Sequence, residues 1–238
     1  MERVKTGIKG FDEIIQGGIP KGSNVLLAGG PGTCKTIFGL SFIYYGAKDY
    51  GEPGLFVTLE ENVKNIVWNM ENFGWNIKPL QDKNLVKIYK MKLNRKENVE
   101  RQIEAELRTI SSIAKEIDAK RLVVDSTTAL SVWLKDPGII RSMLFDFVDG
   151  LKELGCTSLL ISEARPRFQD DKVSFSESGV EEFVSDGVVA LYFTPPNRSV
   201  FVRKMRGTNH SKSVHPFDLT DKGLEINSKD KIMWEAVK

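Results

Sequence analysis

One glycine-rich segment constrains the fold of this chain more than any other stretch. It reads Gly29-Gly30-Pro31-Gly32-Thr33-Cys34-Lys35-Thr36 and lies between two apolar runs, at residues 25–28 and 37–43. Apolar runs on both sides of a glycine-rich turn predict a strand, a loop and a helix in that order. A segment of the form G-x-x-x-x-G-K-[S/T] in this setting is typical of a phosphate-binding loop (P-loop), whose backbone N–H groups and helix N-terminus form an anion cradle. The chain is therefore expected to bind a nucleotide.

The side chains of this loop have separate expected tasks. Lys35 is expected to reach the β- and γ-phosphates of ATP, and the Thr36 hydroxyl is expected to ligate Mg²⁺. ATP and Mg²⁺ are thus the expected cofactors. The expected nucleotide-binding residues are Gly30, Pro31, Gly32, Thr33, Cys34, Lys35, Thr36 and Asp125.

Cys34 stands where the second glycine of the motif belongs. If the backbone there needs a positive φ, a residue other than glycine costs about 1–2 kcal/mol. Because cysteine is small, we interpret it as a tolerated variant that affects affinity and turnover. The alternative is a glycine-rich turn that binds nothing.

Length and composition bound the class of protein. The 238 residues, 41% hydrophobic and 28% charged, suit one large soluble α/β domain spanning residues 1–238. A net charge of +2 neither favours nor excludes nucleic acid. Two cysteines allow no disulfide framework and no paired zinc motif, which favours a reducing, cytoplasmic setting. No apolar run reaches 18 residues, so no membrane span is expected.

Apolar periodicity predicts strands that alternate with helices. Strands are expected near residues 55–59, 84–90, 121–125 and 157–162, and helices near 37–50, 62–70, 96–118 and 139–154. This alternation predicts a largely parallel central sheet flanked by helices on both faces. Residues 188–193 and 199–204 are expected to form an antiparallel C-terminal hairpin, while residues 164–178 look polar and irregular.

Carboxylates follow two of the expected strands. Asp125 ends an apolar strand, as the acid that holds Mg²⁺ through water does in P-loop proteins, although a helix N-cap is the alternative. Glu60 and Glu61 follow the strand at 55–59, where ligands of open α/β sheets bind. A carboxylate there can orient or deprotonate water. The alternative is a first-turn acid favoured by the helix dipole, and the sequence does not say which of the two is the base.

Several segments together resemble a known family. They are residues 6–12 (Thr-Gly-Ile-Lys-Gly-Phe-Asp), the P-loop, Glu60-Glu61, Val123-Val124-Asp125-Ser126, residues 179–187 and Lys204-Met205-Arg206-Gly207-Thr208-Asn209-His210. In these segments the chain resembles the KaiC-like branch of the RecA superfamily of P-loop ATPases, over nearly its whole length. The length is similar to that of a single-domain member.

The resemblance implies a RecA-like fold and a function. Such domains form hexameric rings with ATP between neighbours, so the expected partner is a second copy of the chain. Lys204 and Arg206, which on their own would be taken for a solvated strand edge, match residues that reach the γ-phosphate of the adjacent subunit. Glu60 and Glu61 match the catalytic pair of the family. The implied activity is Mg²⁺-dependent ATP hydrolysis at subunit interfaces.

Two other functions stay open. The stretch Ala164-Arg165-Pro166-Arg167-Phe168-Gln169 combines arginines with an aromatic residue, which suits backbone contact and base stacking in a RecA-like protein that binds single-stranded nucleic acid. A solvated loop explains the same stretch. The other alternative is a regulatory switch that binds ATP with little turnover, which the Cys34 variant keeps open.

Overall fold

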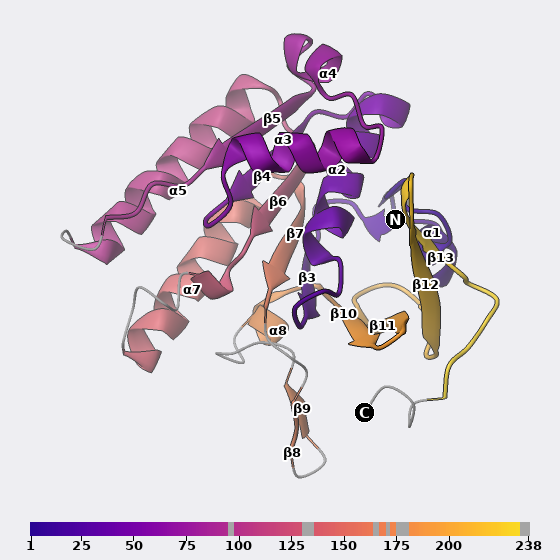
Figure 1. Ribbon diagram of the computed structural model, residues 1–238. Coiled ribbons are helices and arrows are strands. Elements are labelled where there is room, and N and C mark those ends of the chain that lie inside the picture. Colours follow the sequence, from indigo (N-terminus) through magenta and orange to yellow (C-terminus); the bar gives the residue numbers. More distant parts are fainter. Residues whose placement is uncertain (95–97, 130–135, 164–166, 170–171, 175–180, 234–238) are drawn as a thin grey trace.

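The computed structural model describes residues 1–94, 98–129, 136–163, 167–169, 172–174 and 181–233 (Figure 1). Its main feature is a nine-stranded sheet in the order β13-β12-β11-β10-β3-β7-β6-β4-β5. The strands are β1 (Arg3–Val4), β2 (Ile19–Pro20), β3 (Asn24–Gly29), β4 (Gly54–Thr58), β5 (Val86–Lys90), β6 (Arg121–Asp125), β7 (Thr157–Ser162), β8 (Arg167–Gln169), β9 (Lys172–Ser174), β10 (Gly187–Thr194), β11 (Asn197–Met205), β12 (Val214–Thr220) and β13 (Gly223–Ile226). The helices are α1 (Phe11–Ile14), α2 (Lys35–Tyr50), α3 (Val63–Asn72), α4 (Lys78–Asp82), α5 (Val99–Glu116), α7 (Pro137–Glu153) and α8 (Glu181–Val184).

The sheet is parallel from β10 to β5 and antiparallel from β10 to β13. In the central strand β3, Asn24 to Gly29 are all buried, as expected for a strand covered on both faces. The hairpin formed by β10 and β11 confirms the antiparallel C-terminal extension. Its first strand also pairs in parallel with β3, so this hairpin is joined to the P-loop strand.

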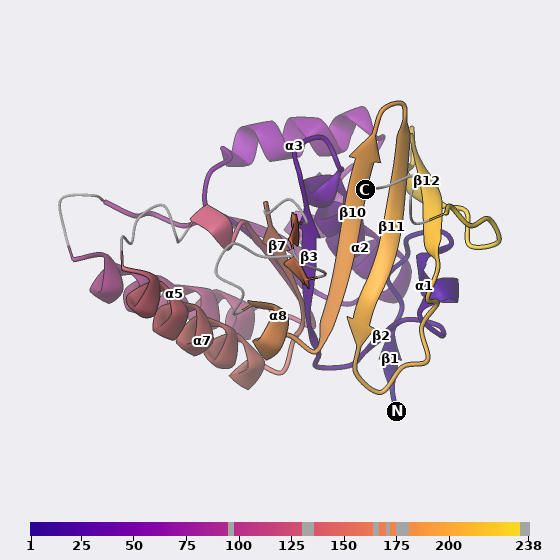
Figure 2. The ribbon, with the colours of Figure 1, turned by 90° about the horizontal axis from the view of Figure 1, so that it is seen from below.

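Alternate residues of each central strand contribute to two separate cores. Val25 and Leu27 belong to the core that contains Phe38 and Phe42 of α2. Leu26 and Ala28 belong to the second core, under α5 and α7. Figure 2 shows α5 and α7 side by side on their face of the sheet. The predicted arrangement of helices on both faces is therefore confirmed.

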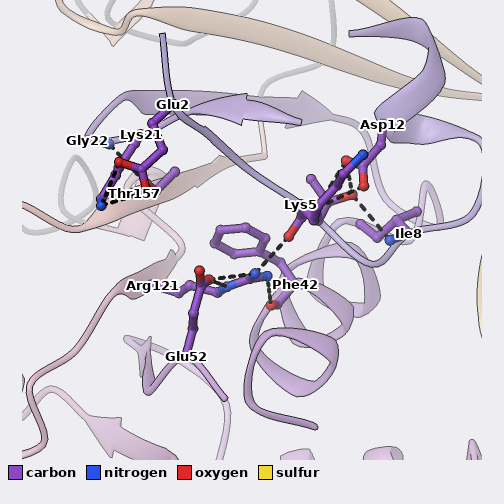
Figure 3. A network of polar contacts seen from close by, with 11 residues as sticks. Glu2, Lys5, Ile8, Asp12, Lys21, Gly22, Phe42, Glu52, Arg121 and Thr157 are labelled. Atoms are coloured by element: carbon purple, nitrogen blue, oxygen red, sulfur yellow. Dashed lines mark hydrogen bonds and ion pairs between the residues drawn. The ribbon is translucent and has the colours of Figure 1, made fainter. Parts of the chain in front are cut away.

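A buried arginine ties the N-terminal segment to the sheet (Figure 3). Arg121, at the start of β6, is 0% exposed. Its guanidinium donates hydrogen bonds to Glu52 at 2.7 Å, to the Phe42 carbonyl at 2.9 Å and to the Lys5 carbonyl at 2.7 Å. Burial lowers the pKa of Arg121, an effect that the carboxylate of Glu52 opposes. This residue links the chain before β2, helix α2 and strand β6.

Smaller elements accompany the main sheet. β1 and β2 form a separate two-stranded pair around α1. A short helix, α4, follows Gly74 and accommodates Pro79 in its first turn. The segment expected to be irregular contains a hairpin, β8 with β9, which extends from the main body in Figure 1. Within the described part of the chain, no helix is both long and apolar enough to cross a membrane.

Candidate nucleotide-binding site

The P-loop joins the end of β3 to the first residue of α2, as predicted. The Thr33 hydroxyl donates to the Gly30 carbonyl at 2.8 Å, and the Lys35 ammonium donates to the same oxygen at 3.0 Å. Gly29 has no room for a side chain, since a Cβ there would lie 2.6 Å from Thr33 Oγ1 and 2.7 Å from the Leu191 carbonyl. The loop is thus tightly folded with its lysine drawn back over it.

Cys34 caps α2 with a left-handed backbone, at φ 68° and ψ 27°. In this conformation a residue other than glycine carries the expected cost of about 1–2 kcal/mol. Burial raises the pKa of the Cys34 thiol, while the positive charge of Arg198 opposes that shift. The thiol is therefore neutral at physiological pH.

Lys35 is buried at the base of the loop. Burial lowers the pKa of Lys35, and the negative charges of Glu163 and Asp125 oppose this shift. A cation that is removed from water gains by meeting a polyanion. The position of Lys35 suits phosphate binding.

Asp125 ends β6 and accepts a 2.6 Å hydrogen bond from the Thr36 hydroxyl. Burial raises the pKa of Asp125 to about 6, although the Thr36 hydrogen bond and the charge of Lys35 lower it. The pair joins one hydroxyl and one carboxylate oxygen from different elements, which is a donor set suited to Mg²⁺. The Asp125 carboxylate accepts the hydrogen bond from Thr36, so the alternative that Asp125 is only a helix N-cap is not favoured.

Glu60 and Glu61 follow β4, directly beside Asp125. Thr58 pairs with Asp125 across the sheet, and the Glu61 amide donates to the Thr58 hydroxyl at 3.0 Å. The carboxylate of Glu61 accepts from Asn69 Nδ2 at 3.2 Å. Helix α3 is capped by Asn62 and has no acid in its first turn. The first-turn alternative is therefore wrong for both glutamates.

Lys204 and Arg206 lie at the other end of the sheet from the P-loop. In register, Gly187 of β10 pairs with both Met205 and Val25, whereas Gly29 pairs with Leu191. Val25 and Gly29 are separated by about 13 Å at the usual rise of 3.3 Å per residue. The Lys204 ammonium donates to the carbonyls of Glu182 and Ser185 at 3.0 and 2.6 Å.

Arg206 at this end is exposed and pairs with Asp186 at 3.0 Å. Burial lowers the pKa of Lys204, and the positive charge of Arg206 lowers it further. Two cations are thus held close together, far from the P-loop of their own chain.

The structure brings two residues to the P-loop that the sequence argument missed. Arg198 Nε donates to the Gly32 carbonyl at 3.2 Å, and its guanidinium lies 4.5 Å from the ring centre of Phe193. Glu163 follows β7 and was not predicted as a site residue. Its negative charge nevertheless acts on the pKa values of Lys35 and Asp125. The rule that selected Asp125, an acid after an apolar strand, would have found Glu163. No local signal marks Arg198.

The segment proposed for nucleic acid is only partly described. Residues 164–166, with Arg165, lie outside the described residues, and residues 167–169 form β8. Residues 167–169 therefore belong to a hairpin with β9, and their side chains lie outside the described part of the structure.

The parallel sheet, the loop after β3 and the acid at the end of β6 together define a P-loop nucleotide-binding protein. The chain belongs to the KaiC ATPase family, whose family model matches residues 4–231.

The comparisons include relatives of similar length. A UPF0273 protein of Pyrococcus horikoshii is 40% identical, covering 97% of this chain and 96% of the relative. A UPF0273 protein of Thermotoga maritima is 39% identical, covering 95% and 96%. The circadian clock oscillator protein KaiC of Prochlorococcus marinus is 33% identical over 95% of this chain, which spans 45% of that protein.

A solved structure agrees with the fold. The crystal structure of a KaiC-like protein of Pyrococcus horikoshii matches with a TM-score of 0.83 and 39% identity, covering 94% of this chain and 98% of that one. The expected resemblance to KaiC-like proteins of the RecA superfamily is confirmed.

Proposed function

We propose that this protein is a Mg²⁺-dependent ATPase whose active site is completed by a second copy of the chain in a ring. One observation carries the proposal: the P-loop and Lys204–Arg206 lie at opposite ends of β3 and β10. Cations that cannot reach the nucleotide of their own subunit can reach that of a neighbour when the subunits are arranged head to tail. The family resemblance favours six subunits.

The first subunit supplies the nucleotide site. The backbone of residues 30–34 holds the phosphates, and the buried Lys35 pairs with the β- and γ-phosphates. Bound Mg²⁺ neutralises charge on the phosphates. Thr36 and Asp125 would hold it, Asp125 through water.

We assign the orientation and deprotonation of the attacking water to the two glutamates after β4. Glu60 and Glu61 lie beside Asp125, at the carboxyl ends of the parallel strands, where the P-loop also lies. Either carboxylate can orient the water and take its proton. Glu61 is anchored by Asn69, while Glu60 is exposed, which makes Glu60 the freer group to meet the water.

Positive charge arrives from both subunits. Arg198 touches the Gly32 carbonyl of its own P-loop, whereas Lys204 and Arg206 of the neighbour face the γ-phosphate. An arginine supplied in this way contributes about 10³–10⁵ in rate in P-loop enzymes.

We propose that residues 1–238 form one ATPase domain. The free thiols of Cys34 and Cys156 suit a reducing cytoplasm.

Mg²⁺-dependent ATP hydrolysis per subunit, measured across a dilution series, tests this function. Specific activity is expected to fall on dilution, together with native mass. Arg206→Ala is expected to lower kcat at least about 10²-fold, while the control Arg108→Ala, which removes an exposed arginine of α5, leaves it unchanged.

Two results would argue against the proposal. Parental activity in Arg206→Ala would remove the neighbour's arginine from the site. Tight ATP binding without turnover at any concentration would favour the regulatory switch, with Cys34 as the residue to revert to glycine.

A further inference from the structure

A tight turn carries Arg206, and we call residues 205–208 the finger turn. The Thr208 amide donates to the Met205 carbonyl at 3.2 Å, and Gly207 has φ +65°. On one side, the Arg206 amide donates to the Asp186 carbonyl at 2.8 Å and its side chain pairs with the Asp186 carboxylate. This side is fixed by the start of β10.

The other side of the finger turn is held by Arg3, more than 200 residues earlier in the chain. Arg3 Nη2 donates to the Gly207 carbonyl at 3.3 Å, and Nη1 donates to the Thr208 hydroxyl at 3.1 Å. Nη1 also donates to the carbonyls of Gly18 at 2.9 Å and Ile15 at 3.2 Å. One rigid guanidinium therefore connects the finger turn to the chain around α1.

Two more hydrogen bonds join the residues after the finger turn to the chain around α1. The Asn209 amide donates to Gln16 Oε1 at 2.8 Å, and the Ser211 amide donates to the Ile14 carbonyl at 2.8 Å. Figure 2 shows β1, β2 and α1 beside β11 and β12. The N-terminal segment is thus a continuous support for the residues that follow the fingers.

Arg3 itself lies far from the P-loop. It pairs in register with Pro20, which precedes the first residue of β3, and the P-loop follows the last. Any effect of Arg3 on the nucleotide of its own subunit would have to cross the length of β3. Arg3 can instead affect a neighbour's nucleotide through the finger turn alone, because it contacts the residues next to Arg206.

We propose that Arg3 is a positioning residue for the shared active site, because it fixes the turn that presents Arg206 to the neighbouring subunit. This inference rests on the proposed function. Without Arg3 the finger turn loses two hydrogen-bond donors and its own direct link to the chain around α1, while the contacts of Asn209 and Ser211 remain. Displacing a charged group by about 1 Å costs up to about 10²-fold in rate.

The first test compares Arg3→Met with Lys21→Met. Both remove one cation from the N-terminal segment, but the Lys21 side chain pairs with the exposed Glu2. We expect Arg3→Met to lower kcat about 10- to 100-fold with KM for ATP nearly unchanged, because Arg206 acts mainly on charge that develops in the transition state. Lys21→Met is expected to match the parent.

Subunit mixing separates positioning in trans from a structural defect. Arg3→Met subunits retain a P-loop, and Lys35→Ala subunits retain the finger turn. The two variants are mixed in equal amounts as dissociated subunits and then assembled. At about one interface in four, the P-loop of an Arg3→Met subunit then meets the finger turn of a Lys35→Ala subunit. We expect activity to return to about a quarter of the parental rate, whereas Arg3→Met alone keeps about 1–10% of it and Lys35→Ala alone is nearly inactive.

The same mixture made with Arg206→Ala in place of Arg3→Met is the reference. If Arg206→Ala is complemented and Arg3→Met is not, Arg3 acts within its own subunit and the inference is wrong, while the proposed function stands. If neither is complemented, the shared site itself is wrong. Parental kcat in Arg3→Met would also overturn the inference.

Arg3→Lys covers the case in which Arg3→Met fails to fold. Lysine keeps the charge but concentrates its donors on one atom, so it cannot span the finger turn and α1 together. We expect an intermediate kcat, complementation by Lys35→Ala, and a melting temperature close to the parent. Parental kcat in the folded Arg3→Lys protein, or a failure of complementation there, would count against positioning by the guanidinium fork.

Discussion

Cys34 holds a left-handed backbone that glycine adopts at little cost, and it does so at the mouth of the P-loop. Cys34→Gly removes a strain of about 1–2 kcal/mol but makes the unfolded chain more flexible, so we expect a net gain of about 0.5–1 kcal/mol in the free energy of unfolding. Urea denaturation measures it. Cys34→Ala keeps the Cβ and is the matched control. A glycine variant that is less stable than the alanine variant would show that the backbone is not strained there.

Asp125 links the stability of the nucleotide-free protein to pH. Its folded pKa of about 6 exceeds the unfolded value, so the stability it contributes is present below about pH 4 and is lost as pH rises through about 6. Asp125→Asn should therefore raise the free energy of unfolding at pH 7.5 by about 1–3 kcal/mol. Urea titrations at pH 4 and pH 7.5 check this.

The two pH values provide the control for the asparagine variant. At pH 4 the aspartate is neutral when folded, so parent and variant should agree. The variant should also lose Mg²⁺-dependent turnover. If the inactive variant is as stable as the parent at pH 7.5 as well as at pH 4, the role of Asp125 in Mg²⁺ binding stands and the raised pKa is refuted.

Two glycines inside helices show how an element depends on what packs against it. In α2, a Cβ on Gly46 would lie 2.3 Å from Arg121 Nε and 2.4 Å from its Cδ. Gly46→Ala should destabilise the protein by at least about 2 kcal/mol, because the buried guanidinium has to move and its hydrogen bonds weaken. Thermal or urea unfolding measures the change.

Gly150 in α7 is the matched control for Gly46. The nearest atom to its Cβ would be Leu107 Cδ1 at 4.0 Å, which is ordinary contact. Gly150→Ala should therefore gain about 0.5–1 kcal/mol from helix propensity. Effects of the same sign at both positions would contradict the proposed packing of Arg121 against α2.

At the scale of the whole molecule, an exposed aromatic side chain lies beside the fingers. Phe183 of α8 is 74% exposed, and the carbonyls that hold Lys204 lie on either side of it. If the fingers face a neighbouring subunit, Phe183 belongs to that interface. Phe183→Ser should raise the concentration for half-assembly about 10-fold, a loss of about 1.4 kcal/mol, as measured by sedimentation.

The control for Phe183 is Phe145→Ser, which removes a 53% exposed phenylalanine from α7. It should leave assembly unchanged. Because neither side chain is buried, both variants should keep the melting temperature of the isolated subunit. An equal effect on assembly from both substitutions would indicate a general loss of solubility and would remove Phe183 from the interface.

The sequence alone determined the parts of this protein that depend on neighbouring residues. Apolar periodicity located the central strands and the long helices, and a contiguous motif located the P-loop. Asp125 was found because a strand and the acid that ends it are adjacent along the chain. The same rule would have found Glu163.

Only the tertiary structure decided which distant segments meet. The register of β10 with β3 placed Arg198 on the P-loop and sent Lys204 and Arg206 to the other end of the sheet. Arg3 reached the finger turn because the N-terminal segment packs beside β11 and β12. Such pairings arise from burial and hydrogen bonding between elements far apart in the chain, which no local pattern of residues encodes.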